Sequence, residues 1–374
     1  MRAASTARRG CADRWKVRYS RGRWAGLMAA VAVLGGLLAA LPLFVPGAAP
    51  AAHADGPTLG STPRTPTPAR TPRITPTPRA TRTPGPDSRR LVIPGLSGAD
   101  QAPSPTATPA LSRPLAPAPA MQGLRTRLQA AIDSYAVGGT YAIAVTDLQT
   151  GEMVSVNGRQ PQISGCVMNI FVLIAAMQDA SWGAYPMSRV QTLIANTLWS
   201  SDAASARQLY GITGGGAVLK GVQRVQSMAD GLGLRDVFID HPPGYPNESL
   251  GLDANNWVTA EDVNGMLAAL YGGRLLDEPY RTQLLDAMTR VRPELNYLLG
   301  SGLTGLVSHK NGFLFEGGGW VDNDAGIVRF TRGGREYAYA VTFLAMDVDG
   351  YLGDVVLGQA LTRLMWEHFS TAYP

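Results

Sequence analysis

The chain has 374 residues, a formal net charge of +5 and 45% hydrophobic residues. From Met121 onward it carries 17 Lys and Arg against 24 Asp and Glu, a net charge of −7, so the basic residues are concentrated before that point. Nucleic-acid-binding domains normally present a basic face, so we expect no nucleic-acid partner for this part. The first 120 residues lack the composition to bury a core, which leaves about 250 residues for one globular domain.

Residues 1–54 have the pattern of a targeting segment. A stretch rich in Arg precedes an uncharged apolar run from Ala25 to Val45. A basic segment before such a run stays in the cytoplasm while the following chain is exported, and the run is long enough to cross a bilayer. Ala52-His53-Ala54 fits a signal-peptidase site. The alternatives of a cleaved signal peptide and a membrane anchor both remain open, and each places the domain outside the cytoplasm, secreted or anchored at the cell surface.

Residues 55–120 are rich in Pro, Thr and Arg, as in the stretch "STPRTPTPARTPRITPTPRATRTPG". Pro at every second or third position removes backbone donors and favours extended polyproline conformations. The scarcity of large apolar residues denies the segment a core. We therefore predict a disordered stalk that holds the domain away from the membrane, in or beyond a cell-wall layer.

The domain from 121 to 374 shows helix and strand patterns in a distinctive order. Leu124, Leu128 and Ile132 recur at helical spacing. The stretch Thr140 to Gly158 has two alternating apolar runs around a turn, which predicts a β-hairpin. Further along, the patterns predict a buried helix over 166–177, mostly helices over 188–298, strands at 305–315, 324–334 and 335–346, and a helix over 352–369. This order predicts an α+β fold whose antiparallel sheet is built from both chain ends, with flanking helices and an inserted all-helical subdomain.

Cys166 is a thiol without an intrachain partner. The only other cysteine, Cys11, precedes the apolar run, and export would leave the two on opposite sides of the membrane. Most free cysteines are small buried hydrophobic residues. An unpaired thiol in an exported protein can also be a nucleophile, so the cysteine count alone leaves both interpretations open.

Two longer stretches carry a resemblance to a known family. "TAEDVNGMLAALYGGRLLDEPYRTQLLDAM" (Thr259 to Met288) resembles the helix pair, and "HKNGFLFEGGGWVDNDAGIV" (His309 to Val328) the two strands, of the class A β-lactamase-like catalytic domain. This domain is part of the penicillin-recognising serine hydrolase superfamily. The likeness extends over 121–374, and all three active-site motifs of the family are altered.

The first motif is Ser-x-x-Lys at the start of a buried helix, where the amine helps to deprotonate the hydroxyl. The matching residues run from Cys166 to Asn169. A thiol needs less activation than a hydroxyl, so the nucleophile is retained in altered form while the base is lost. The resemblance places Cys166 at the catalytic position and Asn169 beside the substrate.

The second motif, Ser-Asp-Asn, supplies a hydroxyl for proton transfer. Two registers match it, Ser201-Asp202-Ala203 and Ser200-Ser201-Asp202. The resemblance makes Ser201 a catalytic residue and Asp202 a substrate-binding one. On the residues alone, Ser and Asp before a run of Ala are more typical of a helix N-cap.

The third motif, Lys-Thr-Gly, corresponds to Lys310-Asn311-Gly312. In the family this lysine attracts the substrate carboxylate and the glycine lets the substrate approach the strand. Lys310 is accordingly expected to be catalytic, and Asn311 and Gly312 to bind substrate. Without the motif, a His-Lys pair at a strand end is usually a solvated edge.

The loop before Thr259 holds the candidates for a further acid or base. Glu248, Asp253 and His241 all lie there, but none fits the family's Glu-x-x-x-Asn pattern, so none is assigned a role. His241 could form a Cys-His pair with Cys166. No His/Cys cluster suggests a metal site, and we expect no cofactor.

Two functions remain open. The first is a β-lactamase-like or D,D-peptidase-like hydrolase that uses a cysteine nucleophile and acts on β-lactams or peptidoglycan peptides. The second is a catalytically inactive, stalked module that binds cell-wall peptide or a partner protein. Loss of a base argues for inactivity, and a nucleophilic side chain at the nucleophile position argues for an enzyme.

Overall fold

The computed structural model describes residues 119–373. The predicted targeting segment and nearly all of the predicted stalk lie outside these residues. Within 119–373, no helix is both long enough and apolar enough to cross a membrane.

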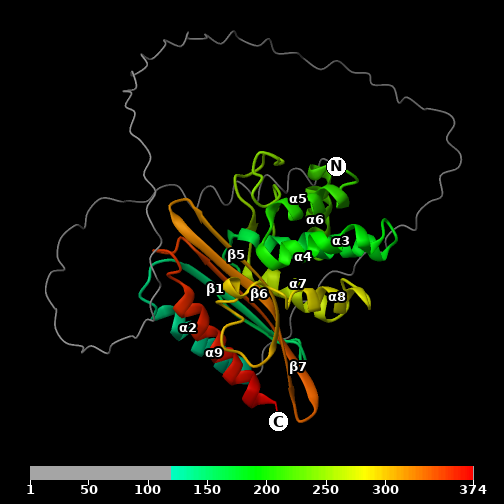
Figure 1. The fold of residues 1–374 in the computed structure, drawn as a ribbon. Helices are drawn as coiled ribbons and strands as arrows, with labels where there is room; N and C mark the ends of the chain where they lie inside the picture. The colour runs from blue at the N-terminus through cyan, green and yellow to red at the C-terminus, as the bar shows by residue number, and fades with distance from the viewer. Residues whose placement is uncertain (1–118, 374) are drawn as a thin grey trace, which may run out of the picture. The chain divides into compact units, whose positions relative to one another are not determined.

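A five-stranded antiparallel sheet forms the centre of the domain (Figure 1). Its strands are β1 (Thr140–Asp147), β2 (Met153–Val156), β5 (Leu306–Glu316), β6 (Gly319–Arg332) and β7 (Arg335–Met346), in the order β2-β1-β7-β6-β5. Strand β1 pairs with β7, with Thr140 opposite Met346. The sheet therefore joins the two ends of the domain, which confirms the predicted α+β class.

Two helices, α2 (Pro119–Asp133) and α9 (Val355–Ala372), cover one face of the sheet (Figure 1). Leu124 and Leu128 of α2 and Leu361 and Met365 of α9 are buried in one cluster with strand residues such as Tyr339. Burying such apolar side chains contributes roughly 1.5–3 kcal/mol each. The first and last helices thus close the same side of the fold.

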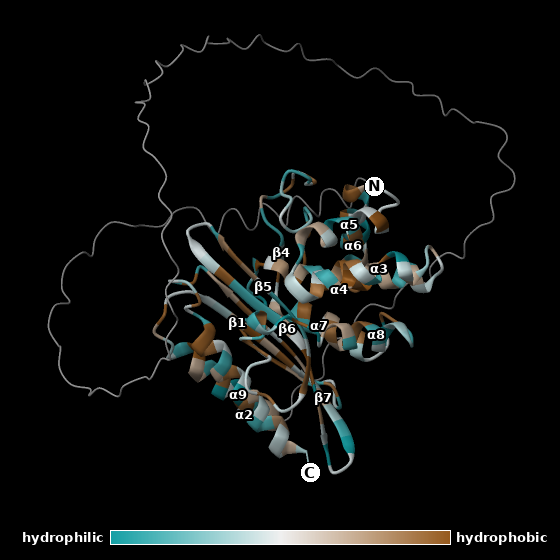
Figure 2. Ribbon diagram, viewed as in Figure 1, coloured by the Kyte–Doolittle hydropathy of each residue, from teal (hydrophilic) through white to brown (hydrophobic). Residues whose placement is uncertain are grey.

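The other face carries the helical subdomain predicted from the middle of the chain (Figure 1). Its helices are α3 (Asn169–Ser181), α4 (Gln191–Ser200), α5 (Ala203–Thr213), α6 (Val218–Gly231), α7 (Ala260–Tyr271) and α8 (Tyr280–Ala287). Helix α3 is buried over almost its whole length, and Figure 2 shows apolar residues along it. A helix that is apolar all round must lie inside a protein.

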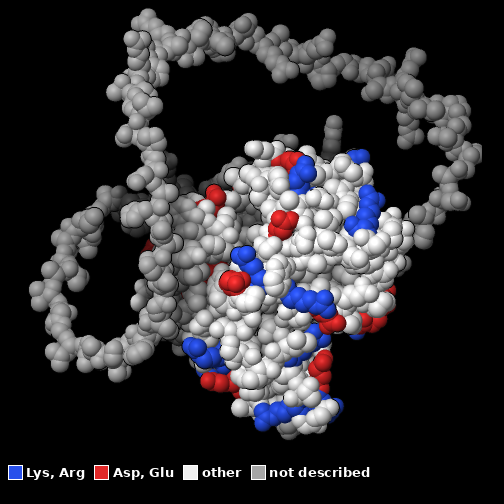
Figure 3. All heavy atoms as spheres, in the orientation of Figure 1, with Lys and Arg blue, Asp and Glu red and all other residues white. Residues whose placement is uncertain are grey.

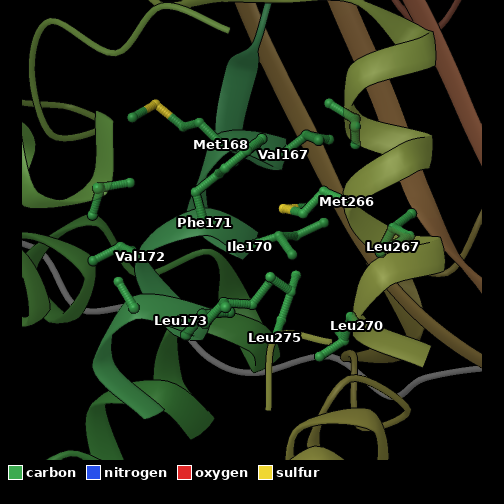
Figure 4. Packing of buried hydrophobic residues seen from close by; sticks show 14 of the residues in the cluster. Val167, Met168, Ile170, Phe171, Val172, Leu173, Met266, Leu267, Leu270 and Leu275 are labelled. Atoms are coloured by element: carbon green, nitrogen blue, oxygen red, sulfur yellow. The ribbon is translucent and has the colours of Figure 1, made fainter. Parts of the chain in front are cut away.

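Helix α3 is the axis around which the subdomain packs. Figure 4 shows Ile170, Phe171 and Leu173 beside Met266 and Leu270 of α7. These contacts hold the start of α3 in a fixed position against the sheet, because close-packed interiors resist displacement of their parts. The residues just before α3 are therefore also held in a fixed position relative to the sheet.

Two local features differ from the expectation. The segment from Gly165 to Met168 forms a 3-10 turn, η1, and the α-helix begins only at Asn169. A second, two-stranded sheet pairs β3 (Gln162–Ile163) with β4 (Trp257–Val258). These strands are two residues long, too short to produce an alternating pattern.

Charges are mixed over the surface. On the face shown in Figure 3, Lys and Arg lie among Asp and Glu and do not form one basic patch. The mixture of both signs on this face is consistent with the net negative charge counted from Met121 onward.

Candidate functional site

The turn that carries Cys166 lies in backbone contact with strand β5. Gly165 has φ +51°, a conformation that favours glycine. A Cβ on Gly312 would lie 2.4 Å from the backbone nitrogen of Cys166. Only glycine at 312 leaves room for this approach, so the two elements meet main chain to main chain. The Cys166 side chain is half-buried and unpaired.

Lys310 links the strand to the helical subdomain. Its side chain is fully buried, and its Nζ donates hydrogen bonds to Ser201 Oγ and to the backbone oxygen of Asn311. Burial lowers the pKa of Lys310, while attraction to Cys166 and to Asp324 acts against that shift. The structure thus brings Lys310, Ser201 and Cys166 into one group, drawn from three separate parts of the chain.

Ser201 and Asp202 occupy the junction between α4 and α5. Ser201 ends α4 with φ +56°. Asp202 caps α5 by accepting a hydrogen bond from Ser205 N at 2.7 Å. The capping interpretation therefore describes Asp202, while the Ser201 hydroxyl faces Lys310. This geometry fits the register Ser201-Asp202-Ala203.

Asn169 is the first residue of α3, one turn beyond Cys166. It is fully buried, and neither atom of its side-chain amide has a hydrogen-bond partner. An amide cannot accept a proton near neutral pH, so Asn169 does not supply the base that a lysine would. Asn311 is also buried, with its Oδ1 unpartnered.

Behind Lys310, a buried polar cluster supports strand β5. His309 Nδ1 lies 2.8 Å from Asp324 Oδ1, and Leu299 N donates to Asp324 Oδ2 at 3.1 Å. Tyr297 donates to Asp322 Oδ1 at 2.8 Å. Sequence reasoning predicted a catalytic role for Lys310 from its motif but assigned no partner to His309 and missed this cluster. A signal was available, because Asp-Asn-Asp in the following strand places two carboxylates on one face.

Burial changes the protonation of this cluster. It raises the pKa of Asp322 to about 9, and the neighbouring charge of Asp354 adds to the rise. Burial also raises the pKa of Asp354, to about 6. Asp322 is therefore protonated at neutral pH.

Asn256 attaches the loop before α7 to the turn η1 through hydrogen bonds. Its Nδ2 donates to Met168 Sδ at 2.8 Å, and its backbone oxygen accepts from Ser164 N at 2.9 Å. Its Oδ1 accepts from Asp240 N at 2.6 Å. Asn256 was not singled out from sequence, because nothing in the local pattern indicates a contact almost ninety residues away.

The three candidate acids and bases of this loop are engaged elsewhere. Glu248 forms an ion pair with Arg207 of α5. The ring nitrogens of His241 lie 2.8 and 3.3 Å from the carbonyl oxygens of Pro242 and Ala254. Asp253 accepts from Asn255 N at 3.1 Å. The contacts of His241 are within its own loop and do not form a Cys-His pair. Over residues 119–373, no group of three or more His, Cys, Asp and Glu side chains is arranged to hold a metal.

Comparison with known proteins agrees with this architecture. The family model described as the β-lactamase enzyme family matches residues 184–369, a range that begins after Cys166. A β-lactamase from Chitinophaga pinensis superposes with a TM-score of 0.56 at 19% identity, covering 66% of this chain and 98% of that one. A class A β-lactamase from Bacteroides cellulosilyticus gives 0.57 at 18%, covering 68% and 100%.

A third similar structure is a variant of PBP-A in an acyl-enzyme complex with penicillin G. Its TM-score is 0.55 at 17% identity, covering 70% of this chain and 99% of that one. No curated protein matches the sequence. Residues 119–373 therefore have a β-lactamase-like fold, and the family match covers the part from 184 to 369.

Proposed function

We propose that this domain is an extracytoplasmic acyl-transfer enzyme that attacks β-lactams or cell-wall peptides with Cys166. The main support for this proposal is the position of Lys310. Its side chain is buried, it donates a hydrogen bond to Ser201, and it interacts electrostatically with Cys166. A nucleophile beside a base that is itself oriented by a third group is the general pattern of covalent catalysis. The N-terminal basic and apolar segments support export and attachment to the membrane.

Lys310 is the proposed base. Its lowered pKa increases the share of neutral amine, which can take the thiol proton directly or through Ser201 Oγ. The Cys166 Sγ then forms a bond to the substrate carbonyl carbon, the carbon–nitrogen bond breaks, and the proton passes to the leaving nitrogen. Water that attacks the resulting thioester releases the acid and restores the thiol.

The oxyanion formed in this attack requires donors at the start of η1. The positive end of the helical segment that begins there favours negative charge at the backbone N–H of Cys166. The close approach of Gly312 brings the edge strand β5 to the same point. Both elements can therefore present main-chain N–H groups to the developing charge.

A second candidate is a catalytically inactive module that binds cell-wall peptide or a partner protein through the same cleft. The observation that favours it is Asn169, which is neutral, buried and unpartnered where the family has its lysine. If Lys310 does not replace that amine, the loss of the base would reduce turnover by about 10²–10⁴-fold.

The test uses the full-length protein with a fluorescent penicillin and a chromogenic cephalosporin. We expect a covalent adduct on Cys166, detected by intact mass and peptide mapping. A thioester is cleaved by neutral hydroxylamine, whereas the ester formed by Cys166→Ser would be far more resistant. Cys166→Ala should give no adduct.

Two results would decide against the enzyme. A folded protein whose Cys166 resists alkylation cannot use that thiol as its nucleophile. Absence of adduct and turnover, together with reversible binding of a muropeptide equal in the native protein and Cys166→Ala, would establish the binding module instead.

A further inference from the structure

Four aromatic rings form an exposed patch at the end of the β5–β6 hairpin. This aromatic patch consists of Phe313, Phe315, Trp320 and Tyr351. Phe313 and Trp320 stack at 4.9 Å, and Tyr351 meets Trp320 edge-on at 5.1 Å. Phe315 is 56% exposed and Tyr351 67% exposed. Contiguous apolar surface of this kind marks interaction sites.

The main chain holds the aromatic patch in place and leaves it open. Paired hydrogen bonds of 3.2 and 3.0 Å between Trp320 and Val348 attach the loop that carries Tyr351 to the hairpin. The hairpin turn itself contains Gly317 and Gly318, and a Cβ at either position would meet nothing within 4 Å. The rings therefore form a preorganised surface, which reduces the entropy lost on binding.

Two carboxylates lie beside the aromatic patch without a positive partner. Glu316 directly follows Phe315, and Asp347 packs against the hairpin, since a Cβ on Gly319 would lie 2.5 Å from its Cα. Within 119–373, neither carboxylate forms an ion pair. Partial burial raises the pKa of Asp347, and no positive charge in these residues opposes the rise.

Aromatic rings next to unpaired carboxylates favour a cationic ligand. A cation is attracted to the face of an aromatic ring, to Trp most strongly, and to a carboxylate through charge. An uncharged apolar partner would cover the two carboxylates without neutralising them, which is unfavourable. The net charge of −7 counted from Met121 onward also attracts cations.

The aromatic patch lies on the strand that reaches the candidate site. Strand β5 is an edge strand, and its Gly312 lies against the backbone of Cys166. Phe315 is three residues further along, roughly 10 Å at the usual rise of a strand. In an extended peptide, one residue and a lysine side chain together span roughly the same distance.

We propose that the aromatic patch binds the ammonium group of a peptide side chain, one residue before the carbonyl that Cys166 attacks. This inference rests on the proposed function and names the class of its substrate, a cell-wall peptide that carries a free amine. The rings cover the methylene groups and the cation, and Glu316 and Asp347 neutralise its charge.

Two synthetic peptides test the proposal in the full-length Cys166→Ala protein, which cannot be acylated at this position. The first is acetyl-Lys-D-Ala-D-Ala. In the second, the lysine is acetylated on Nε, which removes the charge and keeps the chain. We expect the first peptide to bind about threefold to tenfold more tightly in isothermal titration calorimetry. Added NaCl should reduce this preference, because exposed charges are screened.

Two sets of substitutions, each added to Cys166→Ala, locate the preference. Phe315→Ser/Tyr351→Ser and Glu316→Gln/Asp347→Asn should each bring the two dissociation constants closer together. Asparagine is a suitable replacement at 347, because it tolerates the positive φ of +55° there.

Each set has a matched control at exposed positions elsewhere on the domain. Leu219→Ser/Leu306→Ser removes two apolar side chains, and Asp277→Asn/Glu294→Gln removes two charges. Both control proteins should keep the full preference for the cationic peptide.

Three results would overturn the proposal. The first is equal affinity of the Cys166→Ala protein for the two peptides, or no binding of the cationic one. The second is a preference that the patch substitutions leave unchanged. The third is a peptide-free oligosaccharide of N-acetylated sugars whose binding depends on Phe315 and Tyr351 while the two peptides bind equally, which would assign the patch to sugar.

Failure of this proposal is distinguishable from failure of the proposed function. Affinities are measured without Cys166, so they do not depend on its reactivity. A preference for the cationic peptide without any adduct on Cys166 in the native protein would support the patch and reject the enzyme. An adduct on Cys166 without such a preference would do the reverse.

Discussion

Lys310 is the residue on which the proposed chemistry depends. Lys310→Met keeps the length of the side chain and removes the amine. Loss of a general base reduces rate by about 10²–10⁴-fold, so labelling of Cys166 by penicillin should fall by that order. In the native protein, labelling should rise with pH as Lys310 loses its proton, and this rise should occur below the ordinary lysine range. Stopped-flow labelling across pH measures both effects.

A merely structural role for Lys310 predicts a different result. If the methionine variant labels at the native rate with an unchanged pH profile, Lys310 does not transfer the proton. Circular dichroism of the same variant checks whether the fold is intact, because removing one charged group from a buried polar cluster can itself destabilise a protein.

Asp322 should make the stability of the domain depend on pH. Its folded-state pKa of about 9 lies above the unfolded value of 3.8, so folding favours the protonated form. The stabilisation is complete below about pH 4 and is lost as pH rises through about 9. Asp322→Asn keeps an acceptor for Tyr297 and removes the titration. This variant should have a higher melting temperature than the native protein at pH 8.5. The difference in melting temperature should decrease towards pH 4.

Thermal melts of the two proteins from pH 4 to pH 9 measure that gap. Asp277→Asn, at an exposed position, is the matched control and should follow the native curve. A gap that stays constant across pH would mean that Asp322 is ionised in the folded protein.

Individual residues were predictable only where a motif identifies them. The family pattern indicated Cys166, Ser201 and Lys310 as members of one site, and the structure brings them together. It could not indicate the His309–Asp324 pair or the Asn256 contacts, because these depend on which strands and loops become neighbours. Side chains that support a site from behind have no fixed spacing in the sequence.

Strand β5 and turn η1 depend on each other at the element scale. Gly312→Ala would place a methyl group 2.4 Å from Cys166 N and 2.8 Å from Val167 N. Both are main-chain atoms, so rotation of a side chain cannot relieve the clash. Overpacking of this kind costs typically 1–3 kcal/mol. We expect lower stability in urea unfolding and a loss of Cys166 labelling that exceeds the loss of stability.

Gly231→Ala is the control for that substitution. A Cβ at this position in α6 meets nothing within 4 Å, so stability should be unchanged or rise by about 0.4–1 kcal/mol. Equal behaviour of the two variants would contradict the close contact between β5 and η1.

The long elements were predictable and the short ones were not. Alternation identified the β1–β2 hairpin and the strands β5, β6 and β7, and uniform apolar character identified α3. The predicted helix at Cys166 begins instead as a 3-10 turn, because the positive φ of Gly165 and the contact with Gly312 shape the backbone there. Tertiary contact overrides local propensity in such short segments.

The stability of the whole domain depends on its last helix, α9. Truncation after Asp354 removes Leu361, Met365 and Phe369, which are buried against the sheet beside α2. Loss of three such side chains, at about 2–5 kcal/mol each, exceeds the stability of a typical domain. We expect the truncated chain to be insoluble or unfolded by circular dichroism, while removal of Tyr373 and Pro374 alone should leave a folded protein. A cooperative melt of the truncated chain would contradict this interpretation.

The pairing of β1 with β7 also sets the order of events during synthesis. Thr140 and Met346 lie opposite each other although about two hundred residues separate them. Closing so long a loop is slow, and no earlier segment can substitute for β7. The nascent chain therefore cannot complete its sheet until β7 has emerged. We accordingly expect Cys166 to reach its position beside Ser201 and Lys310 only in the completed protein. For the export that we propose, this delay is an advantage, because translocation and folding do not compete.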